Sequence, residues 1–161
     1  MQASGRRRVA VIAALFVFVG LVVMEGLGAA TAANAPNGES VYNEQCSACH
    51  QAGGAGAPGL APPLASKQIA GIARANPAYL ALVVLNGLSG GISLADQGEL
   101  NGIMPPAGGS LQDDEVAAVL GYVTKTLNGI DVEITADTVK MLREKKPSAK
   151  ELRAMRQEFA K

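Results

Sequence analysis

Five consecutive residues, Cys46-Ser47-Ala48-Cys49-His50, are the side chains of this sequence best suited to chemistry. The chain has two cysteines and one histidine, and all three lie in this segment. Two cysteines separated by two residues and followed at once by histidine are typical of c-type haem attachment. Thiols about one helical turn apart can add to the two vinyl groups of one porphyrin. The imidazole of the next residue can then bind the iron, so the motif predicts His50 as an axial ligand.

Other uses of this segment fit less well. A disulfide between Cys46 and Cys49 would close a very short loop and stabilise the fold little. A zinc site needs four ligands, typically cysteine and histidine, and the chain has only three such residues. A thioredoxin-like redox pair requires a surrounding βαβ pattern, which this sequence lacks. The sequence therefore favours one covalently bound haem c on these two cysteines.

A six-coordinate iron needs a second axial ligand opposite His50, and the chain has no second histidine. A methionine thioether can take this position. Met104 lies in the string Gly102-Ile103-Met104-Pro105-Pro106, where two prolines restrict the backbone. Met141 and Met155 lie in charged segments, where methionine is more often a core filler. We predict Met104 as the ligand; the alternative is an open sixth position that binds a gas or peroxide.

Residues 1–35 have the three parts of a secretory signal peptide. Arg6 to Arg8 form a basic region, residues 9–24 form an apolar stretch of 16 residues, and small residues with Ala-x-Ala patterns follow. We expect cleavage after Ala32 or Ala35. The alternative is an uncleaved membrane anchor, for which the apolar stretch is slightly short. Because haem c is attached outside the cytoplasm, the export signal and the haem motif agree and predict a periplasmic protein.

The charges divide the remaining chain into two parts. Residues 36–130 hold 3 basic and 7 acidic side chains, whereas residues 131–161 hold 8 basic and 6 acidic ones. No basic patch is interleaved with aromatic residues, which argues against nucleic-acid binding. The chain has no tryptophan and few aromatic residues. A buried porphyrin would supply the large apolar body that such a core lacks.

After the signal segment the patterns predict a mainly helical body with one small β-hairpin. The glycines and prolines of residues 51–65 predict a loop that can wrap closely around a flat ligand. Ser110, with Asp113 three residues later, is expected to begin the last helix of the body. The expected elements are helices over residues 38–49, 76–86 and 110–127, and a hairpin within residues 88–102.

The tail over residues 131–161 predicts two more short helices. Thr135 or Asp137 can cap the first, and Ser148 with Glu151 forms a capping box for the second. The second helix carries a narrow apolar stripe of Leu152, Met155 and Phe159. Two interpretations stay open: a solvated helix clamped to the body by this stripe, or a docking arm for a partner protein.

As a set, these motifs resemble a class I cytochrome c. The resemblance covers residues 36 to about 128 and rests on the haem motif, Pro62-Pro63-Leu64, Met104-Pro105-Pro106 and residues 113–123. It implies the all-α cytochrome c fold, in which the first and last core helices cross beside the haem. It also implies that the Pro62 carbonyl accepts the ring N–H of the ligand histidine, that Leu64 lines the haem pocket and that Tyr122 packs at the helix crossing. Residues 87–104 resemble the hairpin insert of some bacterial cytochrome c domains.

The expected organisation is a signal peptide over residues 1–35, a cytochrome c domain over 36–130 and a charged helical extension over 131–161. The expected function is single-electron transfer between periplasmic redox proteins, such as a dehydrogenase and a terminal oxidase or reductase, with no catalytic residue. An alternative is a dedicated haem subunit of a periplasmic dehydrogenase complex, and a third class is a ligand-binding or peroxidatic haem protein. The haem-attachment machinery is an expected partner, and a membrane is expected only if residues 9–24 are not cleaved.

Overall fold

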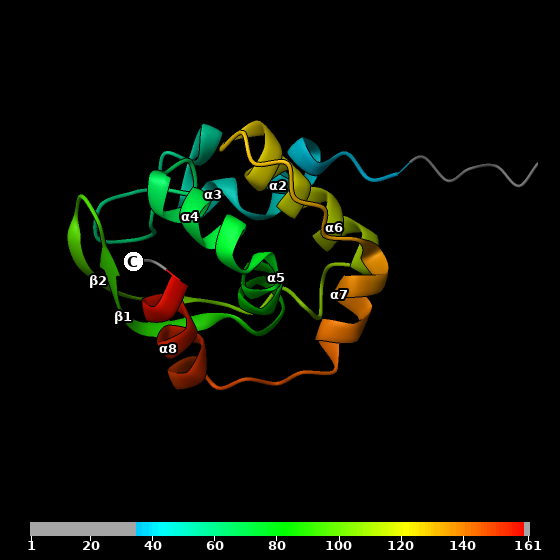
Figure 1. Ribbon diagram of the computed structural model, residues 1–161. Helices are drawn as coiled ribbons and strands as arrows, with labels where there is room; N and C mark the ends of the chain where they lie inside the picture. Colours follow the sequence, from blue (N-terminus) through cyan, green and yellow to red (C-terminus); the bar gives the residue numbers. More distant parts are fainter. Residues whose placement is uncertain (1–34, 160–161) are drawn as a thin grey trace, which may run out of the picture. The chain divides into compact units, whose positions relative to one another are not determined.

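A computed structural model describes residues 35–159, so the predicted signal segment lies outside the described residues except for Ala35. Within this range the prediction of a mainly helical body with one small hairpin is confirmed (Figure 1). The elements are α2 (Gly38–Gln45), α3 (Ser47–His50), the 3₁₀ turn η1 (Ala52–Gly54), α4 (Lys67–Ala75), α5 (Pro77–Asn86), β1 (Leu88–Leu94), β2 (Gly98–Met104), α6 (Asp113–Gly121), the π-helical turn η2 (Tyr122–Thr126), α7 (Ala136–Arg143) and α8 (Ala149–Phe159).

Helices α2 and α6 cross in close backbone contact. A Cβ atom on Gly38 would lie 2.1 Å from the carbonyl oxygen of Ala118, so only glycine permits this approach. The rings of Tyr42 and Tyr122 pack against each other with centroids 5.3 Å apart. Tyr42 is completely buried. The crossing therefore fixes α2 on α6 just before the chain reaches Cys46.

Helix α6 begins later than the sequence predicts. The helix starts at Asp113, and Gln112 is its N-cap in a capping box with Glu115, whose carboxylate accepts the Gln112 N–H at 2.8 Å. The Ser110 hydroxyl instead donates to the carbonyl of Ala107 at 3.1 Å. The prediction that Ser110 begins this helix was wrong because a nearer residue forms the capping box.

Helix α4 was not among the predicted elements. The Ser66 hydroxyl caps it by accepting the N–H of Ile69 at 3.2 Å, and the helix buries Ile69, Ile72 and Ala73. Helix α5 spans Pro77–Asn86, which agrees with the predicted range of residues 76–86, and the side chain of its N-cap Asn76 makes no capping hydrogen bond. Within residues 35–159 no single helix is long and apolar enough to cross a membrane. Only α4 and α5 taken together reach that length and hydropathy, and they are bent by 105°.

The hairpin connects α5 to the Met-Pro-Pro segment. Strands β1 and β2 are antiparallel, with Leu88 opposite Met104 at one end and Leu94 opposite Gly98 at the other. One face buries a small apolar cluster of Ile92, Leu94 and Leu100. Because Leu88 follows α5 after the single residue Gly87, this register places Met104 beside the C-terminal end of α5.

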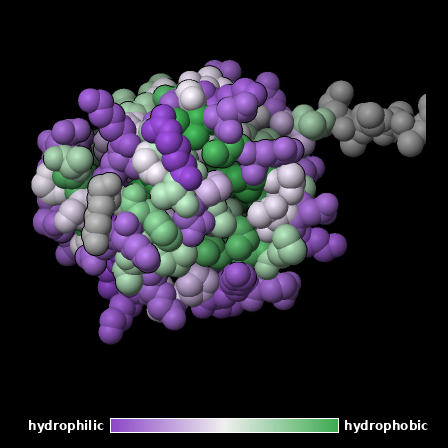
Figure 2. All heavy atoms as spheres, viewed as in Figure 1, coloured by the Kyte–Doolittle hydropathy of each residue, from purple (hydrophilic) through white to green (hydrophobic). Residues whose placement is uncertain are grey.

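The tail helices α7 and α8 pack onto the body. Val139, Leu142 and Leu152 are buried in the same core cluster as the apolar residues of α5 and α6. Thr135 caps α7 by accepting the N–H of Thr138 at 3.1 Å, and the predicted Ser148–Glu151 box caps α8. In Figure 2, apolar residues show across the centre of the viewed face, over α5, and hydrophilic residues surround them.

Candidate functional site

The two cysteines lie at a break between two short helices. Cys46 is the C-cap of α2, and its carbonyl accepts the N–H of His50 at 2.9 Å, so one helical turn separates the motif's ends. Both cysteines are free; Cys46 is partly buried and Cys49 is exposed. Burial, with a smaller contribution from Cys49, raises the pKa of the Cys46 thiol. A raised pKa is the opposite of what the attacking thiol of a redox pair requires, so Cys46 is poorly suited to thiol–disulfide exchange.

The imidazole of His50 is held in one orientation. His50 is 7 % exposed, and its Nδ1 donates to the carbonyl oxygen of Pro62 at 2.9 Å. Burial lowers the pKa of His50, and the bond to Pro62 opposes this only in part. The ring is therefore favoured in its neutral form, with the proton on Nδ1 and a lone pair on Nε2, which is the form that binds a metal.

The loop after His50 is fixed to α2 through a strained residue. Gln51 has a φ of 62°, and within residues 35–159 it is the only residue other than glycine with positive φ. The Tyr42 hydroxyl donates to the Gln51 carbonyl at 2.7 Å. The chain then folds back toward His50, because the N–H of Gly56 donates to the carbonyl of His50 at 2.8 Å. These bonds hold the histidine at the start of a compact, glycine-rich loop.

The end of this loop is tied to the C-terminal end of the helix that follows Met104. Asn128 donates from Nδ2 to the carbonyl of Leu64 at 2.8 Å, and its Oδ1 accepts the N–H of Ser66 at 3.0 Å. Leu64 is partly buried and packs against the main core. The sequence pattern ends the predicted helix at residue 127 and gives no sign of this role of Asn128, since its partners lie 62 and 64 residues away.

The backbone around Met104 is held by α5. A Cβ on Gly87 would lie 2.6 Å from the Met104 carbonyl oxygen and 2.8 Å from the nitrogen of Pro106, and φ of Gly87 is 73°. The N–H of Ala107 donates to the carbonyl of Val84 at 2.9 Å. The Met-Pro-Pro segment therefore has little freedom to move relative to α5.

A side chain of the tail fixes the chain that follows Met104. Arg143 on α7 pairs with Asp113 at 2.7 Å, and it also donates to the carbonyl oxygens of Gly108 and Leu111.

The other two methionines of the described tail have different surroundings from Met104. Met141 is 66 % exposed, and Met155 packs against the core.

The structure brings the histidine loop and the methionine segment together. His50 follows Cys49 directly and is bonded to the carbonyl oxygens of Cys46 and Pro62. A Cβ on Gly102 would lie 3.5 Å from the carbonyl oxygen of Leu60, so the strand before Met104 runs beside the loop after His50. The same two segments line a cavity of about 220 Å³. The two parts of the predicted site thus lie on adjoining segments of the fold.

The two cysteine thiols and the histidine imidazole suit a metal that is carried by a porphyrin. Two unpaired thiols stand one helical turn apart, and a neutral, oriented imidazole follows. Within residues 35–159 no group of three or more His, Cys, Asp or Glu side chains is arranged to hold a metal ion. A haem needs from the chain only two thiols and one or two axial ligands, and these residues supply them.

Comparison with known proteins identifies the family. The family model described as "Cytochrome C oxidase, cbb3-type, subunit III" matches residues 33–123. Among curated proteins, a cytochrome c-552 from Thermus thermophilus is 36 % identical over 130 residues, which cover 76 % of this chain and 96 % of that protein. A second cytochrome c-552 of the same species is 37 % identical over 130 residues, covering 76 % of this chain and 85 % of that protein.

The fold, the site and these relatives define a haem protein of the c type. The chain belongs to the cytochrome c family. It is a monohaem electron-transfer protein with covalently bound haem c and the cytochrome c fold, as the sequence resemblance implies. Its partners in a general sense are other redox proteins.

Proposed function

We propose that this chain is a periplasmic monohaem cytochrome that passes single electrons between partner proteins and performs no bond chemistry. The observation that carries this proposal is the oriented, neutral imidazole of His50 directly after two unpaired thiols. Cys46 and Cys49 would attach the haem, His50 and Met104 would be its axial ligands, and Leu64 would line its pocket. When bound, the haem iron supplies a reversible one-electron change.

Each of these residues has a distinct role in allowing the iron to change oxidation state while its ligands stay in place. The Pro62 carbonyl holds the histidine ring and increases its basicity as a ligand. The thioether of Met104 favours reduced iron and raises the potential. Both ligands lie on restrained segments, one fixed through Pro62 and the other through Gly87 and Ala107. Rigid ligands allow both oxidation states to share one geometry, which favours electron transfer over binding of external ligands.

The proposed location and partners rest on sequence and family. The signal pattern of residues 1–35 supports export, and an uncleaved form would be anchored through residues 9–24. Attachment to two cysteines requires haem-attachment machinery in the same compartment. A periplasmic dehydrogenase would be the donor, and a terminal oxidase or reductase the acceptor. The description of the matched family names a cbb3-type oxidase, which favours a terminal oxidase as acceptor.

A dedicated haem subunit of a periplasmic dehydrogenase is the second candidate. The hairpin and the exposed Lys145, Lys146 and Lys150 provide surface and positive charge beyond a minimal carrier. Replacing these lysines by glutamate should slow reduction by the dehydrogenase and weaken the salt dependence of the rate. Unchanged rates and salt dependence would favour the freely diffusing carrier.

Mass spectrometry and absorption spectroscopy of the exported protein test the proposal. We expect one haem to stay attached after denaturation and its pyridine haemochrome to report two thioether bonds. Cys49→Ser should shift the haemochrome to the single-thioether form, and Cys46→Ser with Cys49→Ser should lose covalent haem altogether. The reduced protein should bind carbon monoxide slowly. Rapid binding by the unaltered protein would contradict six-coordination and favour a ligand-binding haem protein.

A further inference from the structure

Asn128 joins the end of the helix formed by α6 and η2 to the loop that begins at His50. Its Nδ2 donates to the carbonyl oxygens of Leu64 and Val123, each at 2.8 Å. Its Oδ1 accepts the N–H of Ser66 at 3.0 Å. A side-chain amide carries two donor hydrogens and an acceptor oxygen on one planar group, so these three bonds hold Asn128 in a single orientation.

The bonds of Asn128 act on the segment that carries the carbonyl partner of the histidine. Pro62 lies two residues before Leu64, and the residue between them is Pro63, whose ring fixes φ. A displacement of Leu64 is therefore passed to Pro62 with little absorption by backbone rotation. Within the described part of the chain, the other hydrogen bonds of residues 62–66 stay inside this loop or go to helix α4.

The residue before Asn128 contacts the other end of the same loop. Gly54 is buried, and a Cβ there would lie 2.9 Å from Cδ1 of Leu127. The Gly54 carbonyl accepts the N–H groups of Leu64 at 2.8 Å and Ala65 at 3.0 Å. Leu127 thus packs over the start of the loop, whereas Asn128 binds its end. Hydrogen bonds are directional and apolar packing is not, so Asn128 sets the position of the loop's end.

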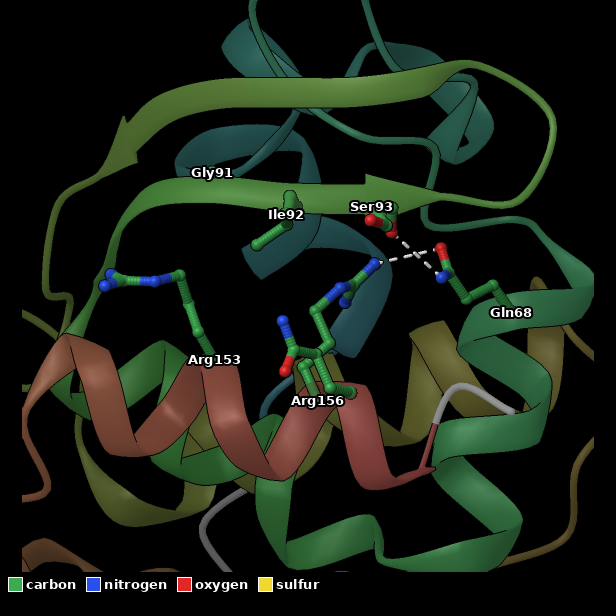
Figure 3. A pocket seen from close by; sticks show the side chains of 7 residues that line it. Gln68, Gly91, Ile92, Ser93, Arg153 and Arg156 are labelled. Carbon is green, nitrogen blue, oxygen red and sulfur yellow. Dashed lines mark hydrogen bonds between the residues drawn. The ribbon is translucent and has the colours of Figure 1, made fainter.

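Helix α4, which follows the loop, has supports of its own. Gln68 on its first turn donates from Nε2 to the Ser93 carbonyl of β1 at 3.0 Å, and its Oε1 accepts Nη2 of Arg156 on α8 at 3.0 Å (Figure 3). These bonds do not involve Asn128. Loss of the Asn128 side chain should therefore loosen the loop and leave α4 in place.

We propose that Asn128 is a positioning residue for the axial histidine: it holds the Pro62 carbonyl where that carbonyl orients the His50 ring. This inference rests on the proposed function, in which His50 binds the haem iron. A carbonyl that accepts the Nδ1 proton makes the imidazole a more basic ligand, and a more basic ligand favours ferric iron. Asn128 therefore influences the potential through a backbone segment, without a hydrogen bond to the ligand itself.

The test compares purified holoprotein variants by two readouts at the histidine. In the reduced protein the haem ring current shifts the proton resonances of a histidine ligand upfield, and exchange of its Nδ1 proton with deuterium measures opening of the bond to Pro62. Electrochemical titration gives the potential. Asn128→Ala removes all three bonds, whereas Asn128→Asp keeps the acceptor for the Ser66 N–H and removes both donors.

Thr124→Val is the matched control. Thr124 is completely buried near the same helix end, and its hydroxyl donates to the Leu120 carbonyl at 2.9 Å, inside the helix. This variant keeps the shape of the side chain and loses a buried hydrogen bond that does not reach the loop. It therefore measures what a general loss of stability does to the two readouts.

We expect the Nδ1 proton to exchange about tenfold faster in both Asn128 variants than in Thr124→Val, because losing such hydrogen bonds makes local opening more frequent by about that factor. The potential of Asn128→Ala should rise above that of the control, since a less basic imidazole stabilises ferric iron less. Asn128→Asp is compared by exchange alone, because its charge shifts the potential by itself.

Exchange no faster than in Thr124→Val, or a potential of Asn128→Ala that does not rise, would refute the role of Asn128. If Asn128→Ala fails to fold, exchange in Asn128→Asp decides. The shift of the ring protons separates this inference from the proposed function. Ring protons of the unaltered protein without the upfield shift would mean that His50 is not the ligand, and both would fail. A shifted ring with unchanged exchange in the variants would refute this inference alone.

Discussion

Replacing Gly38 by alanine should separate the two helices that position the haem motif. The new Cβ would lie 2.1 Å from the Ala118 carbonyl oxygen, well below the 3.0 Å that real Cβ atoms observe. The two backbones would have to move apart by about 0.9 Å, and a backbone yields less easily than a side chain. Such overpacking costs about 3 kcal/mol, against a gain of up to about 1 kcal/mol in helix propensity. We expect Gly38→Ala to lose about 2 kcal/mol of unfolding free energy.

Gly121→Ala is the matched control. Gly121 ends α6 with a helical φ of −58°, and a Cβ there would meet nothing within 4 Å. This variant should therefore gain up to about 1 kcal/mol from propensity alone. Urea unfolding of the two holoproteins, followed by far-ultraviolet circular dichroism, measures both values. Equal stability of Gly38→Ala and Gly121→Ala would refute the inference that the α2–α6 contact requires glycine.

Three further predictions concern the contacts that hold the site and the tail. Arg143→Gln should lose about 2 kcal/mol of unfolding free energy in urea, since a partly exposed ion pair and two carbonyl bonds disappear together; a loss below about 0.5 kcal/mol would mean that solvent replaces them. Tyr42→Phe should cost about 1 kcal/mol by the same assay, because it removes the bond to the Gln51 carbonyl and keeps the ring. The pKa of Glu151 is lowered from its usual 4.5 by Ser148, so its capping contribution is present above pH 4.5 and is lost as the pH falls through the lowered pKa. The stability difference between the unaltered protein and Glu151→Ala should therefore shrink on acidification, and a constant difference would contradict this cap.

Features governed by neighbouring residues could be predicted from the sequence. The capping of α7 by Thr135 and of α8 by Ser148 with Glu151 depends on residues three apart, and the structure shows these bonds. The hairpin was predicted for the same reason, since alternation and a turn are local signals. Helix α4 had a local signal too, because Ser66 precedes apolar residues at Ile69 and Ile72, but the glycine-rich context concealed it.

Features that depend on distant contacts could not be predicted. Gly38 packs against Ala118, which lies far away in the chain. Asn128 likewise bonds to the distant residues Leu64 and Ser66. No periodicity of the sequence encodes these contacts. The burial of Arg156 is the clearest case. On the helix it belongs to a charged surface pattern, and only the packing of α8 under β1 takes it out of solvent.

The central claim is that Met104 opposes His50 at the haem iron, and the absorption spectrum of the oxidised protein tests it most directly. A weak band diagnostic of methionine bound to ferric haem should be present in the unaltered protein and absent from Met104→Ala. Met141→Ala removes an exposed methionine of the tail and should keep the band. A band that survives in Met104→Ala, or that vanishes in Met141→Ala, would contradict the assignment.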